Sequence, residues 1–178
     1  MKIILLYGLT ATGKSVFCNY VANKYNYRVI QIRRLFESVV GKDKAPEVYH
    51  KLLEITKSRC TWLNFISEDI AKTIDGHQIV IIEGLFTLEE SIWFKKISDV
   101  IIVYLETNRV QKRVVRFCIR EHFLLSLGQL KMKNSDIGRI EAGVLFVRDY
   151  ADYIIKNDYS IEAFYEAIDI VINQTQNF

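Results

Sequence analysis

Residues that interrupt or cross-link a chain are scarce in this sequence. Its 178 residues include one proline, Pro46, and three cysteines, Cys18, Cys60 and Cys118. An odd number of cysteines without CxxC spacing favours reduced thiols and a cytoplasmic location over a disulfide framework. Their spacing from the histidines does not resemble a zinc site. With no repeat, linker or low-complexity tract, we expect one domain over residues 1–178.

The sequence also lacks a long apolar run and a strong net charge. The apolar start, Lys2–Tyr7, is too short to span a membrane and is typical of a buried strand. A net charge of +3 is too small to indicate a nucleic-acid partner, so we expect neither a membrane nor a nucleic acid as partner. The charge is nevertheless uneven, because residues 109–133 hold seven Lys or Arg against one acid, Glu121. That cluster favours a local phosphate clamp.

Strand patterns and helix patterns alternate along the chain. Strands are predicted at 3–7, 27–32, 78–82, 99–105 and 153–155. Helices are predicted at 13–25, 88–96, 107–127, 136–149 and 160–172, with one or two more within 46–75. This alternation predicts an α/β fold with three layers, in which helices cover both faces of a five-stranded parallel sheet. Such sheets bind ligands at the carboxyl ends of their strands.

The loop after the first strand carries the most specific motif of the chain. It reads Gly8-Leu9-Thr10-Ala11-Thr12-Gly13-Lys14-Ser15, which fits the Walker A pattern G-x-x-x-x-G-K-[ST]. In such a P-loop the glycines let backbone amides surround phosphates, and the following helix adds positive potential at its N-terminus. The lysine reaches the β- and γ-phosphates, and the serine hydroxyl is a ligand of Mg²⁺. We therefore expect residues 8–16, from Gly8 to Val16, to bind a nucleoside triphosphate with Mg²⁺.

A guanine-recognition motif is missing. A GTPase carries N-K-x-D after a late strand, whereas Asn23-Lys24-Tyr25-Asn26 lacks the aspartate and lies early in the chain. The absence favours ATP as the substrate. A short P-loop chain with an arginine-rich helix late in the sequence is typical of phosphoryl transfer to small molecules.

Two further segments give the sequence a family likeness. Residues 79–84 with Leu88-Glu89-Glu90 and Phe94-Lys95-Lys96 form one, and Ala151–Asp158 forms the other. With the P-loop, they resemble the adenylate kinase and dephospho-CoA kinase group of P-loop kinases, and within it an uncharacterised archaeal family of nucleotide-binding proteins. The resemblance implies the kinase-type strand order 2-3-1-4-5 and a helical lid at about 109–135. It also implies that Asn157 and Asp158 border the adenine.

Kinases of this group place arginines in the lid helix, and three arginines here match that position. Arg113, Arg116 and Arg120 fall on one helical face by their spacing. We expect these three, with Lys14, to be catalytic, because guanidinium groups can neutralise the charge of the transferred phosphoryl group. The alternative is a solvated basic face on a surface helix.

The sequence departs from the group after the second strand, where many of these kinases carry an aspartate. The corresponding stretch, Gln31-Ile32-Arg33-Arg34, has no acid. Arg33 and Arg34 are candidates for binding an acceptor phosphate at the start of an acceptor-binding helical region, about 33–75; they can equally be a surface pair. A hydroxyl acceptor benefits from a general base, so the departure favours a nucleoside monophosphate over dephospho-CoA.

Glu83 ends the third predicted strand. A carboxylate there can hold Mg²⁺ or act as a base, and otherwise it caps a turn. The function predicted from the sequence is ATP-dependent phosphoryl transfer to a small acceptor, most of all a nucleoside monophosphate or related nucleotide. The alternatives are a dephospho-CoA kinase-like enzyme and a nucleotide-binding regulator or slow ATPase without an acceptor.

Overall fold

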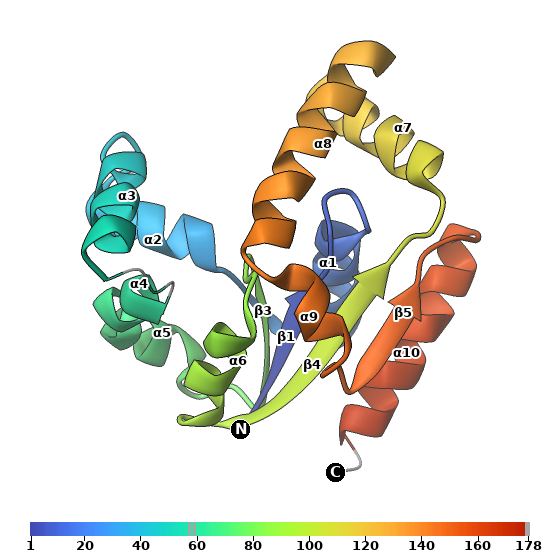
Figure 1. The fold of residues 1–178 in the computed structure, drawn as a ribbon. Helices are drawn as coiled ribbons and strands as arrows, with labels where there is room; N and C mark the ends of the chain where they lie inside the picture. Colours follow the sequence, from blue (N-terminus) through green and yellow to red (C-terminus); the bar gives the residue numbers. More distant parts are fainter. Residues whose placement is uncertain (57, 59, 177–178) are drawn as a thin grey trace.

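The fold is built on a parallel sheet of five strands, ordered β2-β3-β1-β4-β5 (Figure 1). The computed structural model describes residues 1–56, 58 and 60–176. β1 (Lys2–Tyr7) is central and pairs with β3 (Ile79–Glu83) and β4 (Asp99–Glu106). β2 (Arg28–Gln31) and β5 (Tyr153–Lys156) form the two edges. The predicted α/β fold and strand order are confirmed.

β1 is buried on both faces, which explains its continuous apolar sequence. Alternate side chains enter two separate cores, as the period of a strand requires. Ile3, Leu5 and Tyr7 belong to one core, while Ile4 and Leu6 belong to the other. The P-loop therefore starts from a central strand that is buried on both faces.

Helices cover both faces of the sheet. One face is covered by α1 (Lys14–Tyr25) and α10 (Ile161–Gln176), which supply Phe17 and Ile168 to its core. The other is covered by α2 (Ile32–Val40), α4 (Cys60–Phe65), α5 (Ser67–Ile74), α6 (Leu88–Lys95) and α9 (Val144–Arg148). α3 (Ala45–Thr56) packs at the border of this second core.

The helices between β2 and β3 differ from the prediction of one or two within 46–75. The described residues of that range form three helices, α3, α4 and α5, and α2 precedes them. Each of these helices turns only a short apolar stretch towards the core. The apolar spacing over residues 46–75 therefore did not show where one helix ends and the next begins.

The segment after β4 also divides differently. The prediction of one helix at 107–127 is wrong, because α7 (Val110–Glu121) ends at His122, which has a left-handed φ of 56° and donates its backbone N–H to Cys118. α8 (Leu125–Glu141) follows and runs through the expected loop. A second break, at Gly143 with φ of 98°, separates α8 from α9.

α7 and α8 together form a helical hairpin, called the lid hairpin below. It rises above the carboxyl ends of the strands, over the loop that joins β1 to α1 (Figure 1). The two helices approach closely at Gly128, where a Cβ would overlap the Cys118 side chain. The described helices include none that combines the length and the apolar character needed to cross a membrane.

Candidate active site

The P-loop connects β1 to α1 with a backbone that only particular residues can adopt. Gly8 and Gly13 have φ of 135° and 112°, and Ala11 also has a positive φ, of 59°. A Cβ on Gly8 would overlap the Leu105 carbonyl oxygen, and one on Gly13 would overlap the Asn157 side chain. Both glycines are therefore needed for the conformation and for close packing.

Lys14 lies at the start of α1 and folds back over the loop. Its Nζ donates to the carbonyl oxygens of Gly8 at 2.7 Å and Leu9 at 2.6 Å. Burial, followed by the nearby Arg139 guanidinium, lowers the pKa of Lys14 to about 7; Glu83 opposes that shift. The ammonium group is thus held in the loop at a position where added negative charge would stabilise it.

Glu83 ends β3 beside the P-loop and is buried. Gln31, in the register-paired position on β2, donates its Nε2 to Glu83 Oε1 at 2.5 Å. The Cys18 thiol also contacts this carboxylate, and burial, together with Glu83, raises the pKa of Cys18. Ser15 is exposed at the start of α1, with its hydroxyl accessible to a ligand.

The Ser15 hydroxyl and the Glu83 carboxylate lie near the P-loop, and oxygen ligands of this kind suit a hard cation such as Mg²⁺. The described residues contain no group of three or more His, Cys, Asp or Glu able to hold a metal by themselves. Magnesium sites of this kind rely on one or two protein oxygens plus substrate phosphates and water. Ser15 and Glu83 fit that donor set.

The lid hairpin is tied to the P-loop through Thr10. The buried residues Arg113 on α7 and Asp136 on α8 form an ion pair. Arg113 Nε donates to the Thr10 carbonyl oxygen at 2.9 Å, and the Thr10 amide donates to Asp136 Oδ1 at 2.9 Å. The Thr10 hydroxyl also lies 2.9 Å from the Ser135 hydroxyl. Arg113 therefore reaches the P-loop, and its guanidinium has a carboxylate partner there; its catalytic role stays a prediction.

Arg116 connects the lid hairpin to the loop after β5. Its Nη2 donates to the Asn157 backbone oxygen at 3.2 Å and to Asn157 Oδ1 at 3.1 Å. Asn157 Nδ2 in turn donates to the Thr12 carbonyl at 3.0 Å. Burial lowers the pKa of Arg116, and its Nη1 is buried without a hydrogen-bond partner among the described residues.

Asp158, also expected beside the adenine, makes contacts at the start of α7. Its carboxylate accepts the backbone N–H groups of Asn108 at 3.0 Å and Arg109 at 3.3 Å. These bonds satisfy amides that a helix start leaves without partners. Asp158 thereby fixes where the lid hairpin leaves the sheet.

The remaining predicted arginines lie on the surface. Arg120, at the end of α7, pairs with Glu121 at 2.6 Å and lies over the Phe117 ring. The Arg33 side chain is 85% exposed and pairs with Glu37 at 2.8 Å. Arg34, its neighbour, instead lines a pocket next to α1. The structure thus brings Arg113 to the P-loop directly and links Arg116 to it through Asn157, whereas Arg120 pairs with Glu121 on the surface.

Arg139 is a residue that the sequence reasoning missed. It lies on α8, three residues after Asp136, and its guanidinium stacks over the Phe86 ring at 4.5 Å. Its charge is the second largest cause of the lowered pKa of Lys14. The sequence feature that could have indicated Arg139 is its position three residues after Asp136. The prediction started a separate helix at residue 136, beyond the expected lid at about 109–135, so Arg139 was not grouped with the lid arginines.

Comparison with solved structures agrees with this architecture, whereas two comparisons of the sequence find no match. No family model matches the sequence, and no curated protein matches it. Shikimate kinase from Bacteroides thetaiotaomicron is similar in structure, with a TM-score of 0.61, 14% identity, and coverage of 99% of this chain and 98% of that chain. Dephospho-CoA kinase from Campylobacter jejuni has a TM-score of 0.54, 17% identity and full coverage of both chains. A gluconokinase from Sinorhizobium meliloti has a TM-score of 0.59, 14% identity, and coverage of 98% and 95%.

The strand order and the P-loop after β1 define a P-loop NTPase fold of the kinase type. At these identities the solved structures show the fold, and it is the fold of P-loop small-molecule kinases.

Proposed function

We propose that this protein transfers the γ-phosphoryl group of ATP to a small anionic acceptor, with a nucleoside monophosphate or related nucleotide as the leading candidate. The observation that carries the proposal is the position of Lys14, between the P-loop carbonyls and Arg139 of the lid hairpin. The pKa of this ammonium group stays lowered although Glu83 and Asp136 lie near it, so further negative charge would stabilise its protonated form. The triphosphate supplies that charge.

The donor side of the proposed reaction uses the P-loop and the inner arginines. Lys14 contacts the β- and γ-phosphates, and Arg139 approaches the transferred group from α8. Arg116 Nη1, buried beside Asn157, is available to the nucleotide as a donor. Guanidinium groups in a site closed to water stabilise the charge that develops on the phosphoryl oxygens.

Bound Mg²⁺ would offset part of the negative charge of the phosphates. Ser15 and Glu83 would hold it, with Gln31 orienting the Glu83 carboxylate through its amide. Gln31 thus lies at the end of β2, after which many kinases of this group carry an aspartate. There its amide orients the carboxylate of Glu83 on the neighbouring strand, β3. On this proposal the acid that the sequence lacks after β2 is replaced by Glu83.

The acceptor side favours Arg34 over Arg33. Arg33 points into solvent and is paired with Glu37, whereas Arg34 faces a pocket beside α1. Membership of the archaeal adenylate-kinase-like family, to which the sequence bears a likeness, is part of this proposal.

The test is ADP release by a coupled assay over a panel of acceptors, including AMP, CMP, dTMP, dephospho-CoA, shikimate and gluconate. Turnover that depends on one acceptor and disappears in Lys14→Met supports the proposal. Intact ATP binding without acceptor-stimulated turnover by any nucleotide contradicts it. Turnover with dephospho-CoA alone favours the hydroxyl-directed alternative.

One observation supports a second candidate, a nucleotide-binding regulator or slow ATPase. The Thr10 amide of the P-loop donates to the Asp136 carboxylate, so one P-loop donor is directed at the lid hairpin and not at a phosphate. For a regulator, nucleotide binding would change the lid position while no acceptor alters the hydrolysis rate.

A further inference from the structure

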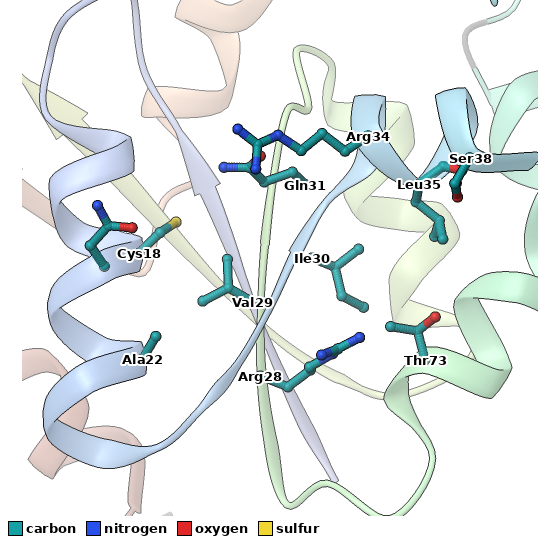
Figure 2. Close-up of a pocket in the computed structure, with 11 residues that line it drawn as sticks. Cys18, Ala22, Arg28, Val29, Ile30, Gln31, Arg34, Leu35, Ser38 and Thr73 are labelled. Carbon is teal, nitrogen blue, oxygen red and sulfur yellow. The ribbon is translucent and has the colours of Figure 1, made fainter. Parts of the chain in front are cut away.

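A pocket of about 410 Å³ runs along the free edge of β2 (Figure 2). One wall comes from α1, and the other comes from α2 and α5. Val29 points towards α1 and Ile30 points to the side of α2, so each adds apolar surface to one wall and the strand itself lies between them (Figure 2). A concave site of this size falls within the range that small ligands occupy. Its lining is Cys18, Asn19, Ala22, Arg28, Val29, Ile30, Gln31, Arg34, Leu35, Ser38 and Thr73.

The charge of this β2-edge pocket has a single sign. Arg34 lies at one end, near Gln31, and Arg28 lies at the other end, near Thr73 (Figure 2). The lining includes no carboxylate. Within the part of the chain that the structure describes, neither guanidinium forms an ion pair or a hydrogen bond with another residue. Arg28 and Arg34 are both exposed to solvent, and two cations without partners at opposite ends of one pocket favour a ligand with an anionic group at each end.

The Arg34 end of the pocket adjoins the phosphate site. Cys18 lies one helical turn after Lys14 on α1, and Asn19 lies one turn after Ser15, so each pair shares a helix face. Gln31 lines the pocket and also donates to Glu83 beside the P-loop. A ligand in the pocket therefore has one end beside Gln31, whose amide holds the Glu83 carboxylate next to the P-loop.

We propose that the β2-edge pocket binds the acceptor, and that the acceptor carries a second anionic group which Arg28 recognises at the end remote from the reaction. This rests on the proposed function. Arg34 binds the anion nearer the P-loop. The Asn19, Ser38 and Thr73 side chains supply polar contacts between the two ends.

The length of β2 sets the length of this acceptor. Arg28 and Gln31 are three residues apart, and at the strand rise they span about 10 Å. Arg34 lies near Gln31 (Figure 2), so the two anionic groups should be separated by a distance of this order, adjusted by the reach of the two arginine side chains. An acceptor with one phosphate or carboxylate would use the Arg34 end alone and bind more weakly.

A series of α,ω-alkane diphosphonates, from ethane to decane, measures this distance directly. Binding is followed by isothermal titration calorimetry without nucleotide, so the outcome does not depend on turnover. We expect affinity to reach a maximum at an intermediate chain length. Arg28→Ala should weaken the best diphosphonate by about tenfold or more, and change methylphosphonate binding by less than about twofold. Arg34→Ala should weaken both probes.

Lys72→Ala is the matched control, because Lys72 is an exposed cation next to Thr73 that does not line the pocket. Lys72→Ala should leave the length dependence unchanged, and ATP binding by each variant shows that the variant is folded.

Affinity for the diphosphonates that is independent of chain length, or unaffected by Arg28→Ala, overturns the proposal. Equal binding of an acetylated acidic tetrapeptide, with contacts along the β2 backbone, would also overturn it in favour of strand addition. If the length dependence holds and no acceptor is phosphorylated, the proposed function fails while the pocket's anion preference stands.

Discussion

Arg113 and Asp136 form a buried ion pair that joins the two helices of the lid hairpin, and both residues also bond with the backbone of Thr10. The pair therefore connects the lid to the P-loop through one residue. Removing one partner of a buried pair leaves an uncompensated charge away from water, which is more costly than replacing both partners.

Asp136→Ala should accordingly lower the free energy of unfolding by about 3–5 kcal/mol. The double variant Arg113→Met with Asp136→Leu should recover a large part of that loss, because it removes both charges while keeping apolar volume. Urea unfolding followed by circular dichroism measures both effects. A double variant as unstable as Asp136→Ala would show that the Thr10 hydrogen bonds, and not charge burial, dominate.

The lowered pKa of Lys14 predicts proton uptake when ATP binds. With a pKa of about 7, most of the free protein's Lys14 is neutral at pH 8, and triphosphate oxygens restore the charged form. Uptake should approach one proton near pH 8 and disappear below about pH 6, where the free protein already holds the proton. Calorimetry of ATP binding in buffers with different ionisation enthalpies measures it.

Stability gives an independent measure of the same group. The unfolded chain keeps this proton up to about pH 10.5, so the native state is penalised fully below pH 7 and progressively less between pH 7 and 10.5. Lys14→Met should therefore raise the melting temperature most at pH 7 and below, while it abolishes ATP binding. A stability gain that does not decrease towards pH 10 would contradict the assigned pKa.

The sequence predicted the strands and the P-loop well, because both depend on short-range patterns. Ile3–Tyr7 is apolar on both faces, and Gly13 with Lys14 belongs to a motif whose chemistry fixes its conformation. The lid boundaries depended on contacts that no local pattern records. His122 ends α7 in a left-handed conformation, and Gly128 lets α8 pack against Cys118.

The same limit applies to the site. Spacing placed Arg113, Arg116 and Arg120 on one face, but it could not show that Asp136, distant in sequence, pairs with the first of them. Spacing also could not distinguish Arg33 from Arg34. The two differ in their surroundings, because Arg33 pairs with Glu37 whereas Arg34 lines a pocket.

Two glycines provide a matched pair for testing the P-loop geometry. Gly13→Ala adds a Cβ at a positive φ and against Asn157, so it should destabilise the fold and remove ATP binding. Gly138→Ala, in α8 with open space around the added Cβ, should stabilise by about 0.5–1 kcal/mol through helix propensity. Melting temperatures and nucleotide titrations of the two variants check both expectations. Retention of ATP binding by Gly13→Ala would mean that the loop adapts.

Arg139 should contribute to the chemical step more than to substrate binding. It stands over Phe86 and close enough to Lys14 to lower its pKa, and under the proposed function its guanidinium acts on the transferred phosphoryl group. Interactions that strengthen as charge develops on the transferred group raise kcat rather than lower KM. Arg139→Ala should therefore reduce kcat by about 10²–10³-fold with a smaller change in the KM for ATP. Arg139→Lys should restore only part of the rate, because an ammonium cannot stack on the ring and form two parallel hydrogen bonds to phosphate oxygens.

Arg120→Ala serves as comparison, since Arg120 is a lid arginine on the surface that pairs with Glu121. If Arg120→Ala reduces kcat as strongly as Arg139→Ala, the lid must rearrange during turnover and bring the outer arginine to the phosphates.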